Sequence, residues 1–315
     1  MRVVIVGASG NLGTALLHRL DQDADVDVAA VSRRIPEPAG VYRTVRSWSS
    51  VDVGGPDAVA QLTTAFAGAD AVVNFAWGFQ PTRRPNLLHR TGVVGSRNVA
   101  AAAAAAGVAH LIHTSSVGAY RPRRDLTAVD EAFPVTGVDG SVYSQHKAEA
   151  ESDLDRWEQQ HPEQIISRLR PGFVLQHDAG AALFRYGLPG WLPGIAMQLL
   201  PVLPLDRSFV IPVIHSDDVA DAVARLIHRP TAGAFNLAAD QPVTRDDVAS
   251  VLSARPLNVP PAVLAAVVQA SWRAQVQPLD AGWIRLAYAV PLLDSSRAAS
   301  AVSYTHLTLP TKRIV

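Results

Sequence analysis

The chain has 315 residues, with 28 Lys and Arg balanced by 28 Asp and Glu, and no cysteine. A net charge of zero argues against nucleic acid as a partner, since phosphate binding needs a concentrated basic surface, and the missing cysteine excludes disulfides and thiolate chemistry. No apolar stretch approaches the ~20 residues of a membrane span, and Met1 leads directly into a strand pattern that leaves no room for a signal peptide, so we expect a cytoplasmic protein without a membrane partner.

Short β-branched runs alternate with helical stretches over the first two-thirds of the chain. This alternation predicts an α/β fold, a Rossmann-like doubly wound parallel sheet with helices on both faces. The predicted strands are Val3–Val6, Val26–Val31, Ala71–Phe75, Val108–Thr114 and Ile165–Leu169. The predicted helices are Leu12–Leu20, Ala58–Phe66, Leu87–Ala106 and Tyr143–Gln160.

The pattern changes after Pro171. Between Gly187 and Pro212, prolines and glycines interrupt large apolar residues, which is typical of an irregular lid or substrate-pocket segment. The strand and helix pattern then resumes, and the end of the chain looks mainly helical. The later predicted elements are a strand at Ile211–Ile214, a helix at Asp218–Ile227 with Asp217 or Asp218 as its N-cap, a strand at Ala234–Leu237 and helices over 243–301.

These changes in pattern predict two regions. The Rossmann domain covers residues 1–172, and residues 208–240 return to it. A smaller, mainly helical substrate-binding region consists of residues 173–207 and 241–301. Residues 302–315 differ in composition from both, through their Thr, Leu and Lys content, and resemble translated vector or adapter sequence. We expect this stretch to be a disordered, non-native tail that replaces a native C-terminus near Ala301.

A glycine-rich turn, Gly7-Ala8-Ser9-Gly10-Asn11-Leu12-Gly13, joins the first strand to the first helix. Glycines permit a tight turn, close approach of the backbone to a pyrophosphate, and close packing of helix on strand. The helix N-terminus adds N–H groups and a positive dipole end. Glycine also occurs in ordinary turns, but this position between strand and helix indicates dinucleotide binding. The predicted cofactor contacts here are Gly7, Ser9, Gly10, Asn11, Leu12 and Gly13.

Two arginines follow the second strand, about 20 residues past the turn, where an NAD site usually has an acidic residue. The stretch Ser32-Arg33-Arg34 occupies that position. It favours NADP, because guanidinium groups can bind a 2′-phosphate; the alternative is a pair of solvated loop charges. Asp52 follows the third strand and could accept a hydrogen bond from the adenine amino group, or it could be an exposed loop carboxylate.

Lysine is almost absent from this sequence. Only Lys147 and Lys312 are present, and arginine supplies the positive charge elsewhere. Lys147 follows Tyr143 by four residues, so both side chains project from one face of the predicted helix. A neighbouring ammonium favours phenolate; we therefore expect Lys147 to lower the pKa of Tyr143, which could then act as general base or acid near neutral pH. The alternative is a chance pairing.

The glycine turn and the Tyr143/Lys147 pair together resemble the short-chain dehydrogenase/reductase superfamily. The resemblance is closest to its extended branch, the NAD(P)-dependent epimerase/dehydratase family, and covers roughly residues 1–293. The other matching motifs, in chain order, are Asn74-Phe75-Ala76-Trp77, Thr114-Ser115-Ser116, Arg170-Pro171-Gly172 and His215-Ser216-Asp217-Asp218-Val219-Ala220.

This resemblance implies a catalytic set of Ser116, Tyr143 and Lys147. Ser116 and Tyr143 would bind the substrate oxygen, and Lys147 would also hold the nicotinamide ribose; Ser115 is a less favoured substitute for Ser116. Hydride would pass between the substrate carbon and NADP or NAD, for which the protein supplies position and electrostatics. The further cofactor contacts implied are Ala76, Trp77, Ser115, Tyr143, Lys147, Pro171 and Gly172.

One position departs from the family pattern. Many relatives carry an asparagine on the long helix, within Asn-Val-x-Gly-Thr, and the corresponding stretch here is Gly92-Val93-Val94-Gly95-Ser96. A proton relay through that asparagine is therefore in doubt, although solvent or a ribose hydroxyl could serve instead.

The expected activity is oxidoreduction of a carbonyl or secondary alcohol, either net or as a step in epimerising a sugar. The apolar segment 183–210 could line a substrate pocket, close as a lid or form a homodimer face. Arg185 and Arg207 are its obvious phosphate partners, so a sugar nucleotide and a hydrophobic carbonyl both remain possible small-molecule substrates. The alternatives are a non-catalytic NAD(P)-binding regulatory or scaffold protein, and an inactive product of a truncated gene. The ten histidines show no metal-binding pattern.

Overall fold

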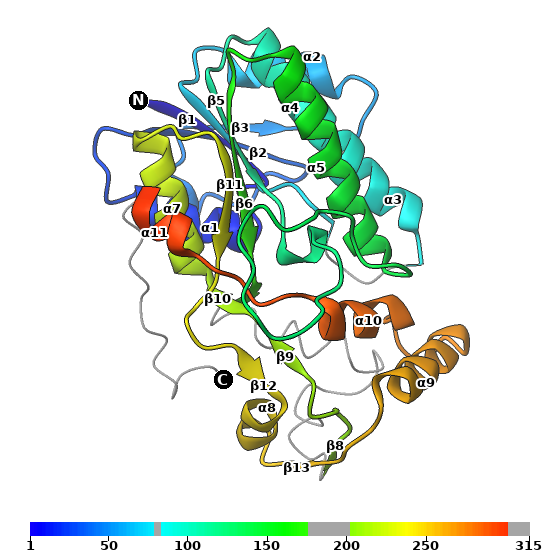
Figure 1. Ribbon diagram of the computed structural model, residues 1–315. Coiled ribbons are helices and arrows are strands. Elements are labelled where there is room, and N and C mark those ends of the chain that lie inside the picture. Colours follow the sequence, from blue (N-terminus) through cyan, green and yellow to red (C-terminus); the bar gives the residue numbers. More distant parts are fainter. Residues whose placement is uncertain (79–82, 176–201, 302–315) are drawn as a thin grey trace.

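The computed structural model describes residues 1–78, 83–175 and 202–301 (Figure 1). The predicted tail lies outside the described residues. So does most of the predicted lid segment, including Phe184, Tyr186, Trp191, Leu192 and Met197. No helix among the described residues is both long and apolar enough to cross a bilayer.

A seven-stranded parallel sheet forms the centre of the molecule, in the order β11-β6-β5-β4-β1-β2-β3. The order runs outward in both directions from the β1–β4 pair, which is the topological switch point of a doubly wound sheet. The central strands β1, β4 and β5 are almost fully buried, as expected for a parallel sheet covered on both faces, whereas the edge strand β3 is partly exposed. Their bounds are β1 Arg2–Val6, β2 Asp27–Ser32, β3 Ser47–Ser50, β4 Ala71–Asn74, β5 His110–Thr114, β6 Ile165–Pro171 and β11 Gly233–Leu237.

Helices cover both faces of this sheet (Figure 1). One face carries α1 (Asn11–Leu20) and α7 (Ser216–His228), which pack with β1 and β11 into one core. The other face carries α2 (Ala58–Phe66), α4 (Gly95–Ala105) and α5 (Val142–Gln160). Two apolar layers on a central sheet confirm the predicted fold class.

Three local predictions were wrong. The single strand expected at Ile211–Ile214 is divided at Pro212 into β9 (Val210–Ile211) and β10 (Val213–His215), which pair with different strands. The helix expected over 87–106 is divided into α3 (Pro85–His89), a π-helical turn (Arg90–Val94) and α4. Its wide turn contains Gly92, which lies directly against the indole of Trp77. The N-cap of α7 is His215, whose Nδ1 accepts from the N–H of Asp217 at 3.3 Å, so neither aspartate is the cap.

Apart from α11, which lies beside α7 and β11, the remaining elements gather near the carboxyl ends of the sheet strands (Figure 1). Residues 243–301 are mainly helical, as predicted, with α11 packed against β11. The helices are α8 Arg245–Val251, α9 Pro261–Arg273, α10 Ala281–Ala289 and α11 Ser296–Ala301. The short strands are β7 Phe173–Leu175, β8 Val202–Leu203, β9 Val210–Ile211, β10 Val213–His215, β12 Val243–Thr244 and β13 Arg255–Pro256.

Candidate active site

The β1–α1 turn requires glycine at two positions, because a side chain there would collide with neighbouring backbone atoms. Gly7 has φ +83°, and a Cβ there would lie 2.9 Å from the backbone N of Ala76. A Cβ on Gly13 would lie 2.5 Å from the carbonyl oxygens of both Gly7 and Ala8. The N-cap residue of α1, Gly10, provides no side-chain cap, so the first N–H groups of the helix are left for a ligand or water. This cradle fits a phosphate.

Ser9, Gly10 and Asn11 are exposed at the rim of the cradle, Leu12 is partly buried, and Gly13 is buried beneath it. The structure therefore brings all the predicted residues of this turn together. They surround the amino end of α1, where an anion gains most from the helix dipole.

The end of β2 presents two exposed arginines. The Ser32 hydroxyl donates to the carbonyl oxygen of Arg34 at 2.7 Å, and the Ser50 hydroxyl donates to that of Arg33 at 3.1 Å. These bonds fix the backbone while the side chains of Arg33 and Arg34 extend at the surface. The Asp52 carboxylate accepts from Arg90 Nη2 and from the Gly54 N–H, both at 3.2 Å, so it already has two donors.

The β5–α5 corner holds the predicted catalytic hydroxyls together. Ser116 follows β5, and its Oγ accepts from the Gly118 N–H at 3.0 Å. The Ser144 hydroxyl donates to the Gly118 carbonyl oxygen at 2.5 Å, which ties the start of α5 to this turn. A Cβ on Gly118 would lie 3.0 Å from Cε1 of Tyr143, so the tyrosine ring rests on glycine backbone. From there the Tyr143 hydroxyl is close enough to Ser116 for that side chain to lower its pKa.

Lys147 lies one helical turn further along α5, and its side chain is 2% exposed. Its Nζ donates to the Thr114 carbonyl oxygen at 2.9 Å and lies 3.5 Å from the centroid of the Trp77 indole. Burial lowers the pKa of Lys147 well below its ordinary value, and the charge of Glu151 offsets part of this effect.

The expected effect of Lys147 on Tyr143 is not found. Burial raises the pKa of Tyr143 to about 12, and the nearby Ser116 side chain lowers it only in part. The physical reason is that the Lys147 ammonium is directed at Thr114 and Trp77. Tyr143 is therefore a neutral phenol near neutral pH.

Two tryptophans flank the Tyr143 ring. Trp77, after β4, is edge-on with ring centroids 6.3 Å apart, and Trp283, on α10, is tilted with centroids 5.3 Å apart. The sequence motif includes Trp77, but nothing in the sequence pointed to Trp283. The two residues come from segments about 200 positions apart, and only the packing of α10 against α5 brings them to one ring.

A buried ion pair between Glu151 on α5 and Arg170 on β6 lies next to this corner. The Glu151 carboxylate on α5 accepts from Arg170 Nε at 2.8 Å and Nη2 at 2.7 Å. Burial would raise the pKa of Glu151, but the hydrogen bonds and charge of Arg170, with a smaller contribution from Ser115, lower it to about 2. Ser115 thus faces the ion pair, whereas Ser116 faces Tyr143. No motif or spacing in the sequence indicated a role for Glu151.

The remaining predicted contacts lie at strand ends. Ala76 is partly buried beside Gly7, and its N–H donates to Oδ1 of Asn74 at 3.1 Å. Pro171 ends β6, and the N–H of buried Gly172 donates to the Leu237 carbonyl oxygen at 2.8 Å. A Cβ on Gly172 would lie 2.7 Å from the Pro212 carbonyl oxygen. These contacts hold β6, β11 and the chain before β10 together at the edge where the site lies.

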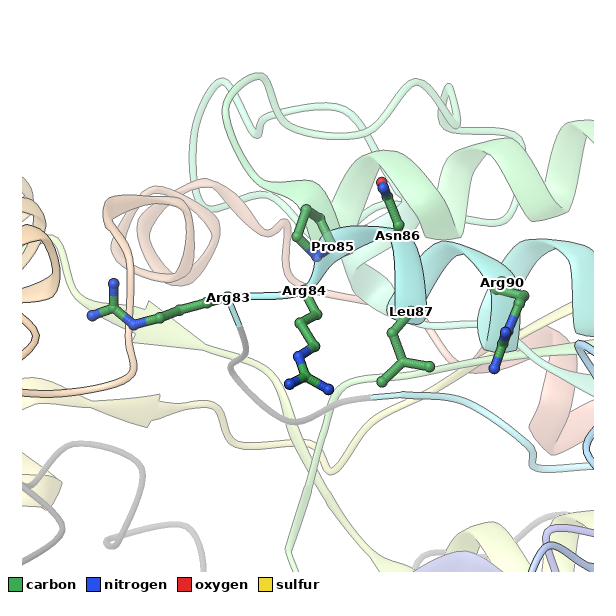
Figure 2. Close-up of a pocket in the computed structure, with 6 residues that line it drawn as sticks. All are labelled: Arg83, Arg84, Pro85, Asn86, Leu87 and Arg90. Carbon is green, nitrogen blue, oxygen red and sulfur yellow. The ribbon is translucent and has the colours of Figure 1, made fainter.

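A cavity of about 480 Å³ opens beside α3 and has three arginines in its lining (Figure 2). The side chains of Arg84, Leu87 and Arg90 point to the same side of the helix, whereas Arg83 extends away from them. The Arg83 guanidinium donates to the Trp272 carbonyl oxygen and lies 4.7 Å from the centroid of that indole. Arg83 therefore links the segment after β4 to α9. No cluster of residues suited to a metal ion is found within the described parts of the chain.

The chain matches the model of the NAD-dependent epimerase/dehydratase family over residues 3–238. It belongs to this family, as the motifs predicted. Solved structures show the same fold: a UDP-glucose 4-epimerase from Thermus thermophilus in complex with NAD is similar over 100% of this chain and 96% of that chain, with a TM-score of 0.71 and 20% identity. A UDP-N-acetylglucosamine 4-epimerase from Bacillus cereus covers 100% and 94%, with a TM-score of 0.72 and 14% identity.

Curated relatives carry several activities in their names. An N-acetyl-alpha-D-glucosaminyl-diphospho-ditrans,octacis-undecaprenol 4-epimerase of Escherichia coli is 30% identical over 174 residues, 55% of this chain and 48% of that protein. A putative dihydroflavonol 4-reductase of Synechocystis is 28% identical over 166 residues, 51% and 46%. An L-arabinose 1-dehydrogenase (NAD(P)(+)) of Haloferax volcanii is 29% identical over 188 residues, 56% and 68%. The chain spans about half the length of the first two relatives.

Proposed function

We propose that the protein catalyses NAD(P)-dependent oxidoreduction at a carbonyl or secondary alcohol, with Ser116, Tyr143 and Lys147 as the catalytic set. The observation that carries this proposal is the β5–α5 corner. There Ser116 lies close enough to the Tyr143 hydroxyl to lower its pKa, and the Lys147 ammonium lies one helical turn away, bonded to Thr114. Buried side chains of this kind, converging at the carboxyl end of a parallel sheet, are suited to proton transfer.

The glycine cradle supports the cofactor assignment. Its tight backbone suits a pyrophosphate, and this shape requires glycine at positions 7 and 13, where a side chain would collide with neighbouring backbone atoms. When bound, NAD(P) would supply the hydride donor or acceptor. Arg33 and Arg34 are exposed at the end of β2, which supports a preference for the 2′-phosphate of NADP. Ser32 and Ser50 stabilise that backbone from below.

The state of Tyr143 favours one direction of proton transfer. A phenol with a pKa of about 12 is protonated at neutral pH and can donate to a substrate carbonyl oxygen. Ser116, close to the same hydroxyl, would help to hold that oxygen. The protein's own groups thus support carbonyl reduction as the first candidate direction.

The walls of the site support a substrate with an apolar face. Trp283 and Trp77 flank the Tyr143 ring, so a hydrophobic carbonyl compound is the first candidate. A sugar also presents an apolar C–H face to aromatic rings, and one relative is named as a 4-epimerase. Epimerisation of a sugar nucleotide through a transient oxidation is therefore the second candidate.

A substrate panel tests this proposal. Purified protein with NADPH or NADH would be given hydrophobic aldehydes and ketones, and separately UDP-sugars, and the nicotinamide absorbance and sugar epimers would be followed. We expect NADPH oxidation with a hydrophobic carbonyl in wild type but not in Tyr143→Phe. Binding of the cofactor without turnover of any substrate would instead support the non-catalytic regulatory or scaffold role.

A further inference from the structure

The indole of Trp77 covers the ammonium of Lys147. Nζ lies 3.5 Å from the ring centroid, well inside the roughly 6 Å within which a cation and an aromatic face attract each other. The ammonium also donates a hydrogen bond to the Thr114 carbonyl oxygen at 2.9 Å. Because Lys147 is 2% exposed, the ring face and this carbonyl stand where water would otherwise solvate the charge.

Gly92 leaves the space in which this ring lies. A Cβ on Gly92 would be 2.9, 3.0 and 3.1 Å from three atoms of the Trp77 indole, so any larger residue would displace the ring. Gly92 lies within the π-helical turn Arg90–Val94, a local geometry that often marks functional sites. This is also the position where the family pattern has asparagine. The indole thus takes up space that a side chain at position 92 would need.

The titratable groups around Lys147 offset only part of the effect of burial. The charge of Glu151, on the same helix, raises the pKa of Lys147, but this carboxylate is also held by Arg170 through two hydrogen bonds. His113, on β5, is neutral, because burial and the charges of Lys147 and Arg168 lower its pKa to about 3. Tyr143, on α5, is a neutral phenol. The Trp77 ring face is therefore well placed to offset the cost of burying the ammonium.

We propose that Trp77 is a positioning residue for Lys147, whose charged form it holds beside Tyr143, and that Gly92 is required for this placement. The consequence for catalysis rests on the proposed function. The effect on Lys147 itself does not, and it can be measured in the protein without any substrate or cofactor.

The sequence makes this measurement unusually direct. Lys147 and Lys312 are the only lysines, so protein labelled with ¹³C- and ¹⁵N-lysine gives two side-chain signals. Lys312→Arg assigns them by removing one. Titrating the Lys147 Cε and Nζ shifts against pH then gives the pKa of this one buried group.

Four variants separate the ring face from general effects of substitution. Trp77→Leu removes the π face, and Trp77→Phe keeps a smaller one. Gly92→Ala leaves Trp77 in the chain but displaces its ring. Trp157→Leu is the matched control. Trp157 is on α5, like Lys147, but its ring stacks on His161 with ring centroids 3.9 Å apart.

We expect Trp77→Leu to lower the pKa of Lys147 by about one unit, a tenfold change in its dissociation constant, because a desolvated cation–π contact contributes on this scale. Trp77→Phe should give a smaller change, Gly92→Ala a change in the same direction, and Trp157→Leu none. The Gly92→Ala/Trp77→Leu double variant should match Trp77→Leu alone, since both changes remove one contact. Circular dichroism checks that each variant is folded.

An unchanged or raised Lys147 pKa in folded Trp77→Leu and Trp77→Phe overturns the proposal, because the ring would then act only as a cover that excludes water. Once a substrate is known, the pH profile of kcat should shift in Trp77→Leu with the Lys147 pKa and stay in place in Trp157→Leu. If wild type binds neither NADPH nor NADH, the proposed function fails, while the measured effect of Trp77 on Lys147 still stands or falls independently.

Discussion

The β1–α1 turn and the β5–α5 corner form two parts of the candidate site by different means. The turn offers backbone N–H groups, and its shape depends on absent side chains at Gly7 and Gly13. The corner depends on side chains that come from separate segments and meet at one ring: Ser116, Tyr143, Lys147, Trp77 and Trp283.

This difference predicts opposite sensitivities to mutation. At the turn, added volume should be harmful whatever its chemistry, because the close neighbours are backbone atoms that cannot move aside. At the corner, a change of chemistry at constant shape should be harmful, because the hydroxyls and the ammonium are the working groups.

The largest effect should come from Tyr143→Phe, which keeps the ring and removes the hydroxyl. Loss of a positioned proton donor should lower kcat by about 10²- to 10⁴-fold, with cofactor affinity nearly unchanged. Tyr42→Phe removes a hydroxyl that is hydrogen-bonded to the Thr14 hydroxyl at 3.3 Å and serves as the control. Equal turnover in the two variants would remove Tyr143 from the catalytic set.

The buried ion pair under the corner should dominate stability. Glu151→Ala leaves Arg170 buried without its carboxylate, so the free energy of unfolding should fall by about 3–5 kcal/mol. Glu149→Ala, on the same helix, breaks exposed contacts with Arg97 and His89 and should cost about 1 kcal/mol or less. Urea denaturation measures both, and similar losses would contradict the importance given to burial.

The same ion pair should give a pH-dependent stability. The folded-state pKa of Glu151, about 2, is lower than that of an unfolded glutamate, about 4.3. The stabilisation is therefore complete above about pH 5 and is lost as the pH falls through the folded value. Between pH 5 and 2, wild type should lose more stability than Glu151→Ala does, and parallel curves would rule out this assignment.

At the turn, the same Gly→Ala substitution should have different effects at different glycines. Gly13→Ala places a Cβ 2.5 Å from two carbonyl oxygens, which should cost about 1–3 kcal/mol of stability and weaken cofactor binding. Gly10→Ala meets one carbonyl oxygen at 3.3 Å, with φ −86°, and should be milder in both respects. Thermal unfolding and nicotinamide fluorescence compare the pair. A milder Gly13→Ala would show that the turn is not the tight cradle described.

The fold and the turn could be predicted because their signals are local. Alternation of β-branched runs with helical stretches locates the strands, and the glycine spacing lies within a single turn. The helix carrying Tyr143 and Lys147 could likewise be predicted from an i, i+4 pair. Family membership follows from the same motifs and is confirmed over residues 3–238.

The corner's environment could not be predicted, because it is made of long-range contacts. Trp283 reaches Tyr143 only through the packing of α10, and Arg170 pairs with Glu151 across 19 residues. The pKa expectation for Tyr143 was wrong for the same reason, since sequence spacing shows the nearby lysine but not the burial of the ring. The π turn at Gly92 depends equally on a distant neighbour, Trp77.

The central claim is that this site binds a nicotinamide dinucleotide at the β1–α1 turn, with Arg33 and Arg34 favouring NADP. The most direct measurement is a titration of wild type and Arg33→Ala/Arg34→Ala with NADPH and NADH, following nicotinamide fluorescence. We predict that wild type binds NADPH more tightly than NADH by roughly tenfold or more, as expected for charge-assisted hydrogen bonds to a phosphate, and that the double variant loses this preference. Equal binding of both cofactors would contradict the NADP assignment, and binding of neither would contradict the account as a whole.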